Sequence, residues 1–300
     1  MMEFSTLQKQ FPVVCQLRYN EPMLAHTSFR IGGPAEAMLF PKSEKELSTV
    51  LQETARLGLT PKVLGAGTNV LAPDAGIPGL TICLKDALDG VEELEGNRIR
   101  VAAGVTMTRA AVFAASRNLS GMEFAHGIPG TVGGGVYMNA GAYGGEIKDI
   151  CISVDVMSMD GTVQTLSASE MQFSYRHSYL EDVGGIVVSA VFQLTPKPEA
   201  EIRSYMQELI GKRKASQPLD MPSAGSAFKR PTGGYAAALI DQAGLKGFRV
   251  GGAAISTKHA GFAVNMGDAT ARDVKELLQQ VSDIVYERSG IRLEPEVRIW

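Results

Sequence analysis

The sequence predicts a protein that mixes α-helices with β-strands and divides into two or three domains. Its 300 residues exceed the ~100–200 of a single domain, and 45% of them are apolar, which is enough to bury a sizeable core. Near the N-terminus, segments with helical periodicity alternate with short apolar segments typical of strands, and the middle of the chain combines helix with antiparallel strand. We therefore expect the α+β class.

The first predicted helix begins at Ser43. Glu46 follows three residues later and completes a capping box, and Gly58 provides the stop. The apolar stripe between them consists of Leu47, Val50, Leu51 and Ala55. A short apolar run at Val63 and Leu64 then opens into the loop 65–69, which predicts a strand that leads into a tight turn.

The middle region carries one helix and two strands. The helical stripe is formed by Met107, Ala110, Ala111 and Ala114. Apolar residues alternate with polar ones over 152–156, and the strand is followed by the hairpin signal Asp160-Gly161. A further strand is predicted over 186–194, after which Pro196 and Pro198 mark a domain boundary.

The last hundred residues again mix both kinds of element. Helices are predicted over 202–210 and 235–243, and strands near 249–256 and 261–265. A long helix is expected from Thr270, and it ends at Gly290.

Charge and hydropathy exclude several classes of function. The 29 Lys and Arg nearly balance the 32 Asp and Glu, and no long basic block is present, so no nucleic-acid partner is expected. No 18 apolar residues run together, and Met1 to Phe11 lacks the apolar core of a secretion signal. We therefore expect a cytoplasmic protein without a membrane partner.

The cysteines and histidines do not predict a disulfide framework or a metal site. Cys15, Cys83 and Cys151 are odd in number and far apart, so they are expected to be reduced and structural. The four histidines have no metal-ligand spacing and are expected to form hydrogen bonds, with His126 close enough to the glycine-rich segment to contact a ligand there.

Glycine is concentrated in loops. The 33 glycines are about 11% of the chain, against near 7% on average, and eight of them fall within 127–145. Such a backbone can approach a ligand closely and bind an anion through successive N–H groups. The loop 65–69 adds a second cluster, so the two together predict a dinucleotide diphosphate. The alternative is that these glycines only allow the chain to turn.

Two common nucleotide motifs are absent. Val70 stands where the third glycine of G-x-G-x-x-G would follow Gly65 and Gly67, which disfavours a Rossmann site. No glycine leads into Gly-Lys-Ser or Gly-Lys-Thr, so ATP chemistry is not expected. A different flavin- or nucleotide-binding fold is needed.

A set of motifs distributed over nearly the whole chain resembles the UDP-N-acetylenolpyruvoylglucosamine reductases. The motifs are Thr27-Ser28-Phe29-Arg30-Ile31-Gly32-Gly33-Pro34, Gly65-Ala66-Gly67-Thr68-Asn69, the segment 127–144, Tyr175-Arg176-His177-Ser178, Pro222-Ser223-Ala224-Gly225-Ser226-Ala227-Phe228-Lys229, Gln242-Ala243-Gly244-Leu245-Lys246-Gly247, His259-Ala260-Gly261-Phe262 and Glu294-Pro295-Glu296-Val297-Arg298. The sequence departs from the family pattern in two places: Gly135 stands where alanine is common, and the short span from Arg176 to Leu194 leaves no room for the substrate-covering tyrosine loop of larger members. It therefore resembles the compact subclass of the family.

The resemblance implies an FAD-binding fold of the vanillyl-alcohol-oxidase (PCMH) type, with subdomains at residues 1–75 and 76–197 and a C-terminal α+β substrate-binding domain at 198–300. It implies non-covalent FAD, NADPH as co-substrate, and reduction of UDP-N-acetylglucosamine enolpyruvate to UDP-N-acetylmuramate in peptidoglycan precursor synthesis, on which bacterial cell shape and division depend. A monomer is expected.

The residues expected to bind FAD come from the two glycine-rich clusters and one further glycine. They are Gly65, Ala66, Gly67, Thr68, Asn69, Gly104, Gly127, Ile128, Pro129, Gly130, Val132, Gly133, Gly134, Asn139, Gly141 and Ala142. Lys229, Arg230 and Arg298 are expected to contact the substrate carboxylate or diphosphate, although such side chains on loops most often serve solubility alone.

The resemblance assigns the chemistry to Ser226, Arg176 and Glu296, which are expected to converge on the substrate side of the flavin. Ser226 would give a proton to the carbon bearing the carboxylate, and Arg176 would hold that carboxylate and its developing enolate. Because a carboxylate repels an enolate, Glu296 is expected to be protonated, or paired with Arg176 or Arg298, when the charge develops.

Other interpretations remain open. Without the resemblance, the serine is a loop residue, the arginine a salt-bridge partner and the glutamate a strand-edge ion pair. A flavin oxidase of the same fold, or a non-catalytic flavin- or sugar-nucleotide-binding regulator, is the alternative function.

Overall fold

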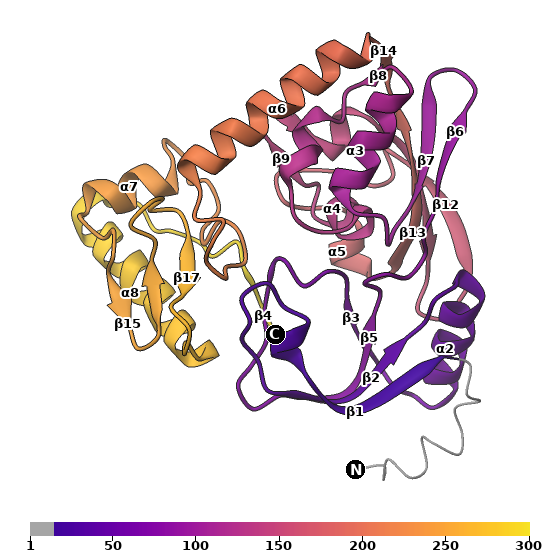
Figure 1. The fold of residues 1–300 in the computed structure, drawn as a ribbon. Coiled ribbons are helices and arrows are strands. Elements are labelled where there is room, and N and C mark those ends of the chain that lie inside the picture. Colours follow the sequence, from indigo (N-terminus) through magenta and orange to yellow (C-terminus); the bar gives the residue numbers. More distant parts are fainter. Residues whose placement is uncertain (1–14) are drawn as a thin grey trace. The chain divides into compact units, whose positions relative to one another are not determined.

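The structure is a computed structural model that describes residues 15–300 (Figure 1). The segment Met1 to Phe11, on which the expectation about a secretion signal depends, lies outside the described residues. The chain forms two compact units. Unit 1 comprises the described part of Met1–Arg18 with Met38–Ala66 and Leu80–Gly211, and unit 2 comprises Tyr19–Ala37, Gly67–Gly79 and Lys212–Trp300. The division into domains at residues 75 and 197 stays a prediction.

Unit 1 is built around a five-stranded antiparallel sheet in the order β12-β11-β13-β7-β6. Its strands are β6 (Val91–Leu94), β7 (Arg98–Ala102), β11 (Cys151–Met157), β12 (Val163–Ser167) and β13 (Ile186–Gln193). The central strand β13 is buried except at its last residue. The predicted hairpin is confirmed, because β11 and β12 pair across Asp160-Gly161 and Gly161 has a φ of +83°.

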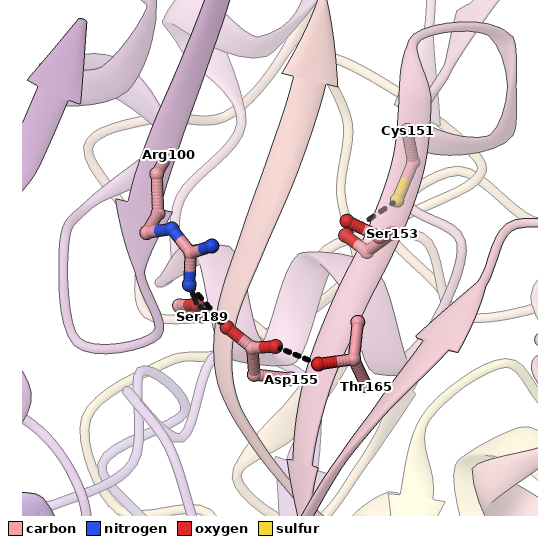
Figure 2. A network of polar contacts seen from close by, with 6 residues as sticks. All are labelled: Arg100, Cys151, Ser153, Asp155, Thr165 and Ser189. Atoms are coloured by element: carbon pink, nitrogen blue, oxygen red, sulfur yellow. Dashed lines mark hydrogen bonds and ion pairs between the residues drawn. The ribbon is translucent and has the colours of Figure 1, made fainter. Parts of the chain in front are cut away.

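One carboxylate joins four of these strands (Figure 2). Asp155 on β11 accepts hydrogen bonds from Arg100 on β7 at 2.5 Å, Ser189 on β13 at 2.6 Å and Thr165 on β12 at 2.7 Å. Burial alone would raise the pKa of Asp155, but these hydrogen bonds and the Arg100 charge lower it below the ordinary value. In the same sheet, burial raises the pKa of the free Cys151 thiol to about 12.

Two helices of unit 1 begin at side-chain caps that the sequence provides. The helix α2 (Glu44–Arg56) starts after Ser43, whose hydroxyl accepts from the Glu46 N–H, and Gly58 follows its end as predicted. Thr106 caps α3 (Met107–Ser116) in the same way. The others are α4 (Val132–Tyr137), α5 (Leu180–Val183) and α6 (Glu199–Ser216), of which the last continues into unit 2 and is longer than predicted.

Short elements complete the N-terminal two thirds of the chain. Two-stranded pairs are formed by β8 (Leu119–Ser120) with β14 (Thr195–Pro196) and by β9 (Gly141–Ala142) with β10 (Gly145–Glu146). The 3-10 helices are η1 (Met23–Ala25), η2 (Glu123–Gly127) and η3 (Ile147–Asp149). A four-stranded sheet has the order β1 (Gln16–Pro22), β2 (Pro34–Phe40), β5 (Ile77–Cys83) and β3 (Lys62–Leu64), and β3 runs parallel to β5.

Unit 2 packs two helices with a small sheet. Strands β15 (Arg249–Val250), β16 (Ala253–Ile255) and β17 (Ala263–Asn265) are antiparallel and shorter than predicted, and the helices are α7 (Ala236–Gln242) and α8 (Ala271–Ser289). The prediction for α8 is confirmed, since Thr270 and Asp273 form a capping box and Gly290 ends the helix at a φ of +72°. The buried core includes Phe29, Ile240, Val274, Leu277 and Val281.

The strand β4 (Val70–Leu71) pairs in parallel with β18 (Arg298–Ile299), which joins the 67–79 segment of unit 2 to the last strand of the chain. The mixture of helices with mainly antiparallel strands confirms the α+β class. None of the helices within residues 15–300 is both long and apolar enough to cross a lipid bilayer.

Candidate functional site

The glycine-rich segment 127–145 forms the end of η2, the helix α4 and the hairpin β9–β10. The start of α4 is held by main-chain bonds: Val132 N donates to Val105 O and Gly133 N to Ala103 O, each at 2.8 Å. These two N–H groups are used within the protein, so Val132 and Gly133 shape the segment and do not offer main-chain donors to an anion. The remaining predicted residues nearby, Gly127 to Gly130, lead into the helix and are partly or well exposed.

The glycines in and around this segment differ in what an added side chain would meet. A Cβ on Gly104 would overlap the carbonyl oxygen of Ala87, one on Gly133 would lie 2.8 Å from the Ala103 Cβ, and one on Gly135 would lie 2.7 Å from Met107 Sδ. A Cβ on Gly134 or Gly65, in contrast, would meet only the Thr131 hydroxyl, at 3.8 and 3.4 Å. Packing excludes a side chain at Gly104 and Gly133, and at Gly135 a side chain would contact the flexible end of Met107, whereas Gly65 and Gly134 border space that no packed atom fills.

Thr131 lies between these two glycines and was not among the predicted site residues. It is the N-cap residue of α4, but its side chain forms no capping hydrogen bond. Its hydroxyl is therefore available to a ligand beside two residues that lack side chains. This arrangement, contained within unit 1, fits a phosphate group, since hydroxyl and close-approaching glycine backbone are what a diphosphate requires. The sequence signal was a threonine directly before a glycine-rich helix.

The second glycine loop continues into unit 2 at Gly67. Gly67 has a φ of +64°, and a Cβ there would overlap the carbonyl oxygen of His26, so only glycine fits. Its own carbonyl accepts from Ser28 N at 3.0 Å. The next residues reach the C-terminal strand: Asn69 Nδ2 donates to Glu296 O at 3.2 Å, and Arg298 N donates to Asn69 O at 3.0 Å.

Ser226 and Glu296 lie on paired segments of unit 2. Glu296 N donates to Ala227 O at 2.9 Å, and Lys229 N donates to Glu294 O at 2.8 Å. On the other side, Ala227 N donates to Gly261 O at 2.8 Å, next to the bridge between Ser226 and Phe262. Main-chain pairing thus brings the predicted proton donor and the predicted catalytic carboxyl onto neighbouring segments. Both residues are half-buried.

Arg176 belongs to unit 1 and has a left-handed backbone, with a φ of +56°. It occupies a tight turn in which Ser174 and His177 exchange both main-chain hydrogen bonds. Its Nη2 donates to Gly141 O at 3.2 Å, and its guanidinium lies 5.1 Å from the centre of the Tyr175 ring. A non-glycine residue in this conformation costs about 1–2 kcal/mol and is typical of functional positions.

Asn139 is fully buried, and its side chain is occupied within unit 1. Its Nδ2 donates to Glu146 Oε2 at 2.9 Å and to Ser174 O at 2.8 Å, while its Oδ1 accepts from Lys148 N at 2.9 Å. Gly141 and Ala142, also predicted to bind the cofactor, form β9 beside Arg176. The structure therefore gives Asn139 a role that the sequence did not indicate.

The three predicted substrate contacts have partners in unit 2. Lys229 Nζ donates to Glu294 Oε1 at 2.6 Å, in a pair whose carboxylate is well exposed. Arg230 lies 4.6 Å from the centre of the Tyr235 ring. Arg298 forms part of β18, beside Asn69. All three belong to unit 2, as do Ser226 and Glu296.

The histidines form hydrogen bonds, apart from one nitrogen next to the glycine-rich segment. His26 pairs with Glu21, His177 with Asp182, and the Nδ1 of His259 accepts from Gly261 N. His126 Nδ1 is buried with no partner among the described residues. Burial lowers the pKa of His126, and the Arg203 charge adds to this, so its ring is neutral near pH 7. Within residues 15–300, no group of three or more His, Cys, Asp or Glu could hold a metal ion.

Comparison with known proteins identifies two regions of the chain. Residues 35–167 match the family model of the FAD binding domain, and residues 217–300 match that of the UDP-N-acetylenolpyruvoylglucosamine reductase C-terminal domain. The reductase of that name from Agathobacter rectalis is 45% identical over 98% of this chain and 96% of its own length. The one from Levilactobacillus brevis is 41% identical, over 99% and 97%.

A solved structure extends the similarity to the fold. The UDP-N-acetylenolpyruvylglucosamine reductase from Thermus caldophilus aligns with a TM-score of 0.78 and 36% identity, over 95% of this chain and 98% of its own. The expected fold, an FAD-binding region followed by a C-terminal α+β domain, is confirmed. The chain belongs to the UDP-N-acetylenolpyruvoylglucosamine reductase family.

Proposed function

We propose that this protein reduces UDP-N-acetylglucosamine enolpyruvate to UDP-N-acetylmuramate, with FAD as cofactor and NADPH as reductant, in peptidoglycan precursor synthesis. The observation that carries the proposal is similarity over 98% of the chain to a relative named for the reduction of this substrate. We expect the enzyme to act in the cytoplasm as a monomer.

The FAD diphosphate would be held by residues that border space free of packed side chains. Gly65, Gly134 and the Thr131 hydroxyl supply that space within unit 1. Gly67 to Asn69 would supply the second part of the binding loop. FAD, when bound, would take two electrons and a proton from NADPH and deliver them to the vinyl methylene carbon of the substrate.

The chain's own residues would then stabilise and neutralise the negative charge that develops on the neighbouring carbon. Arg176 would bind the substrate carboxylate through its planar guanidinium, which stays positively charged at any working pH and stabilises the developing enolate. Its fixed position beside Gly141 supports this role, because a preorganised donor need not move during the reaction.

Ser226 would donate the proton that completes the saturated product, and its oxygen would recover a proton from solvent. Glu296 would act beside it from the neighbouring segment of unit 2. The hydrogen bond from Glu296 N to Ala227 O supports their joint action, since it ties the two segments together. Lys229, Arg230 and Arg298 would contact the substrate's negatively charged groups.

Anaerobic spectroscopy of the purified flavoprotein tests this function. NADPH should bleach the visible flavin absorption, and the enolpyruvyl sugar nucleotide should restore it stoichiometrically. Absence of bleaching, or a reduced flavin that the substrate does not reoxidise, contradicts the proposal. Reoxidation by oxygen alone, with no response to the substrate, would indicate an oxidase.

A further inference from the structure

The segment 174–178, called here the arginine turn, is attached at both ends by buried polar side chains. Before Arg176, the carbonyl oxygen of Ser174 accepts from Asn139 Nδ2 at 2.8 Å. After it, the hydroxyl of Ser178 donates to Tyr137 O at 2.7 Å. Asn139 and Ser178 are both fully buried. Each bond joins the arginine turn to the glycine-rich segment, and all these residues lie in unit 1.

The hydrogen-bond partners around Asn139 require an amide side chain at this position. Both of its N–H groups donate, one to Ser174 O and one to Glu146 Oε2, and its carbonyl accepts from Lys148 N. An aspartate of the same shape would place one carboxylate oxygen, in the position of Nδ2, against both the Ser174 carbonyl oxygen and the Glu146 carboxylate. Buried acceptors without donors are costly, so the site requires an amide.

The attachment explains how Arg176 keeps a strained backbone. A non-glycine residue stays in the left-handed region only when its surroundings fix it there. With Ser174 and Ser178 both fixed, Arg176 has no freedom to relax, and its Nη2 remains 3.2 Å from Gly141 O. The two buried side chains therefore set where the guanidinium lies relative to β9.

We propose that Asn139 is a positioning residue for the reduction of the enolpyruvyl substrate, that Ser178 supports it, and that both act through Arg176. This inference rests on the proposed function, in which Arg176 binds the substrate carboxylate. It changes the role expected for Asn139, because a side chain with three internal hydrogen bonds orients the arginine turn and does not contact FAD.

Rapid-mixing kinetics on the FAD-loaded enzyme test the proposal in two half-reactions. Asn139→Asp and Asn139→Ala should slow reoxidation of the reduced enzyme by substrate about 10–100-fold, since displacements near 1 Å have effects of this size. Reduction by NADPH and the FAD content should stay within about twofold of wild type. Loss of FAD in proportion to activity would overturn the proposal and make Asn139 a cofactor contact.

Ser178→Ala removes a single hydroxyl and provides a milder variant should the Asn139 variants fold poorly. Thr54→Val is the matched control, because Thr54 is equally buried in unit 1 and its hydroxyl donates to Leu51 O within α2. Ser178→Ala should slow substrate reoxidation severalfold, and Thr54→Val should leave it unchanged. Equal effects of the two variants would show a general loss of stability and overturn the proposal.

A double-mutant cycle identifies the route of the effect. In an Arg176→Ala background, Asn139→Ala should slow substrate reoxidation by less than about twofold further, because residues that act as a unit are non-additive. Full multiplication of the two effects would overturn the proposal. Hydrogen exchange tests the attachment independently of the proposed function. The His177 amide should exchange faster in Asn139→Ala than in wild type, even if the wild-type enzyme fails to reduce the enolpyruvyl substrate. Unchanged exchange would contradict the attachment.

Discussion

The two regions that carry the candidate catalytic residues are held in place by different means. In unit 1, Arg176 depends on side chains, since buried Asn139 and Ser178 fix the ends of its turn. In unit 2, Ser226 and Glu296 depend mainly on main-chain bonds, to which Asn69 Nδ2 adds one side-chain bond to Glu296 O. Substitutions of buried polar residues should therefore displace the first region, whereas the second region should lose stability mainly when a backbone N–H is removed.

The largest effect is expected from removing such an N–H group. Ala227→Pro deletes the hydrogen bond to Gly261 O in a fully buried position, and we expect it to lower the free energy of unfolding by about 3 kcal/mol. Urea denaturation checks this. Ala227→Gly, which keeps the N–H, is the control and should cost about 1 kcal/mol. Similar losses for both would mean that main-chain pairing does not hold this region.

The next effect concerns packing around α4 in unit 1. Gly133→Ala places a methyl against the Ala103 Cβ and backbone and should cost about 1–3 kcal/mol. Gly135→Ala meets only the flexible end of Met107, and the gain of about 1 kcal/mol in helix propensity should offset that contact. Thermal unfolding of the two variants distinguishes these outcomes, and a reversed order would contradict the assignment of Gly133 to packing.

The stability that the Asp155 hydrogen bonds give to the sheet of unit 1 should depend on pH. The pKa of Asp155 is lowered in the folded state, so its network contributes stability above the unfolded pKa near 4, and this is lost as pH falls through the folded value. Asp155→Asn should cost about 1–3 kcal/mol at pH 7 and progressively less below pH ~4. The exposed Asp268→Asn is the control, and a pH-independent difference would count against the network.

The smallest effect should come from a side-chain contact beside Ser226. The ion pair between Lys229 and Glu294 is partly exposed, so Glu294→Gln should change the free energy of unfolding by less than ~1 kcal/mol and turnover by less than about twofold. Steady-state kinetics and urea denaturation measure both. A large loss of turnover would show that this side-chain pair, and not the backbone alone, places the Lys229 segment for the substrate.

Local signals allowed much of the fold to be predicted. Capping residues and glycine stops placed α2 and α8 because each acts within one or two turns of its own helix. The hairpin at Asp160-Gly161 was equally local. Strands β15 to β17 were overestimated in length, since two- and three-residue strands are defined by their partners and not by alternation.

The site was predicted only in part, for a related reason. The candidate catalytic residues and both glycine loops stood out as motifs, but the contact between Asn139 and Ser174 spans 35 residues and leaves no local pattern. The left-handed backbone of Arg176 likewise depends on its surroundings, because nothing in an arginine favours that conformation. Thr131 directly precedes a glycine-rich helix in the sequence, but only the structure places its hydroxyl beside Gly65 and Gly134.

The most direct test of the account compares the two half-reactions in Ser226→Ala. Stopped-flow reduction of the flavin by NADPH should proceed within about twofold of wild type, while the enolpyruvyl sugar nucleotide should reoxidise the reduced variant about 100-fold or more slowly, as loss of a positioned acid requires. Equal slowing of both half-reactions, or reoxidation at the wild-type rate, would contradict Ser226 as the proton donor.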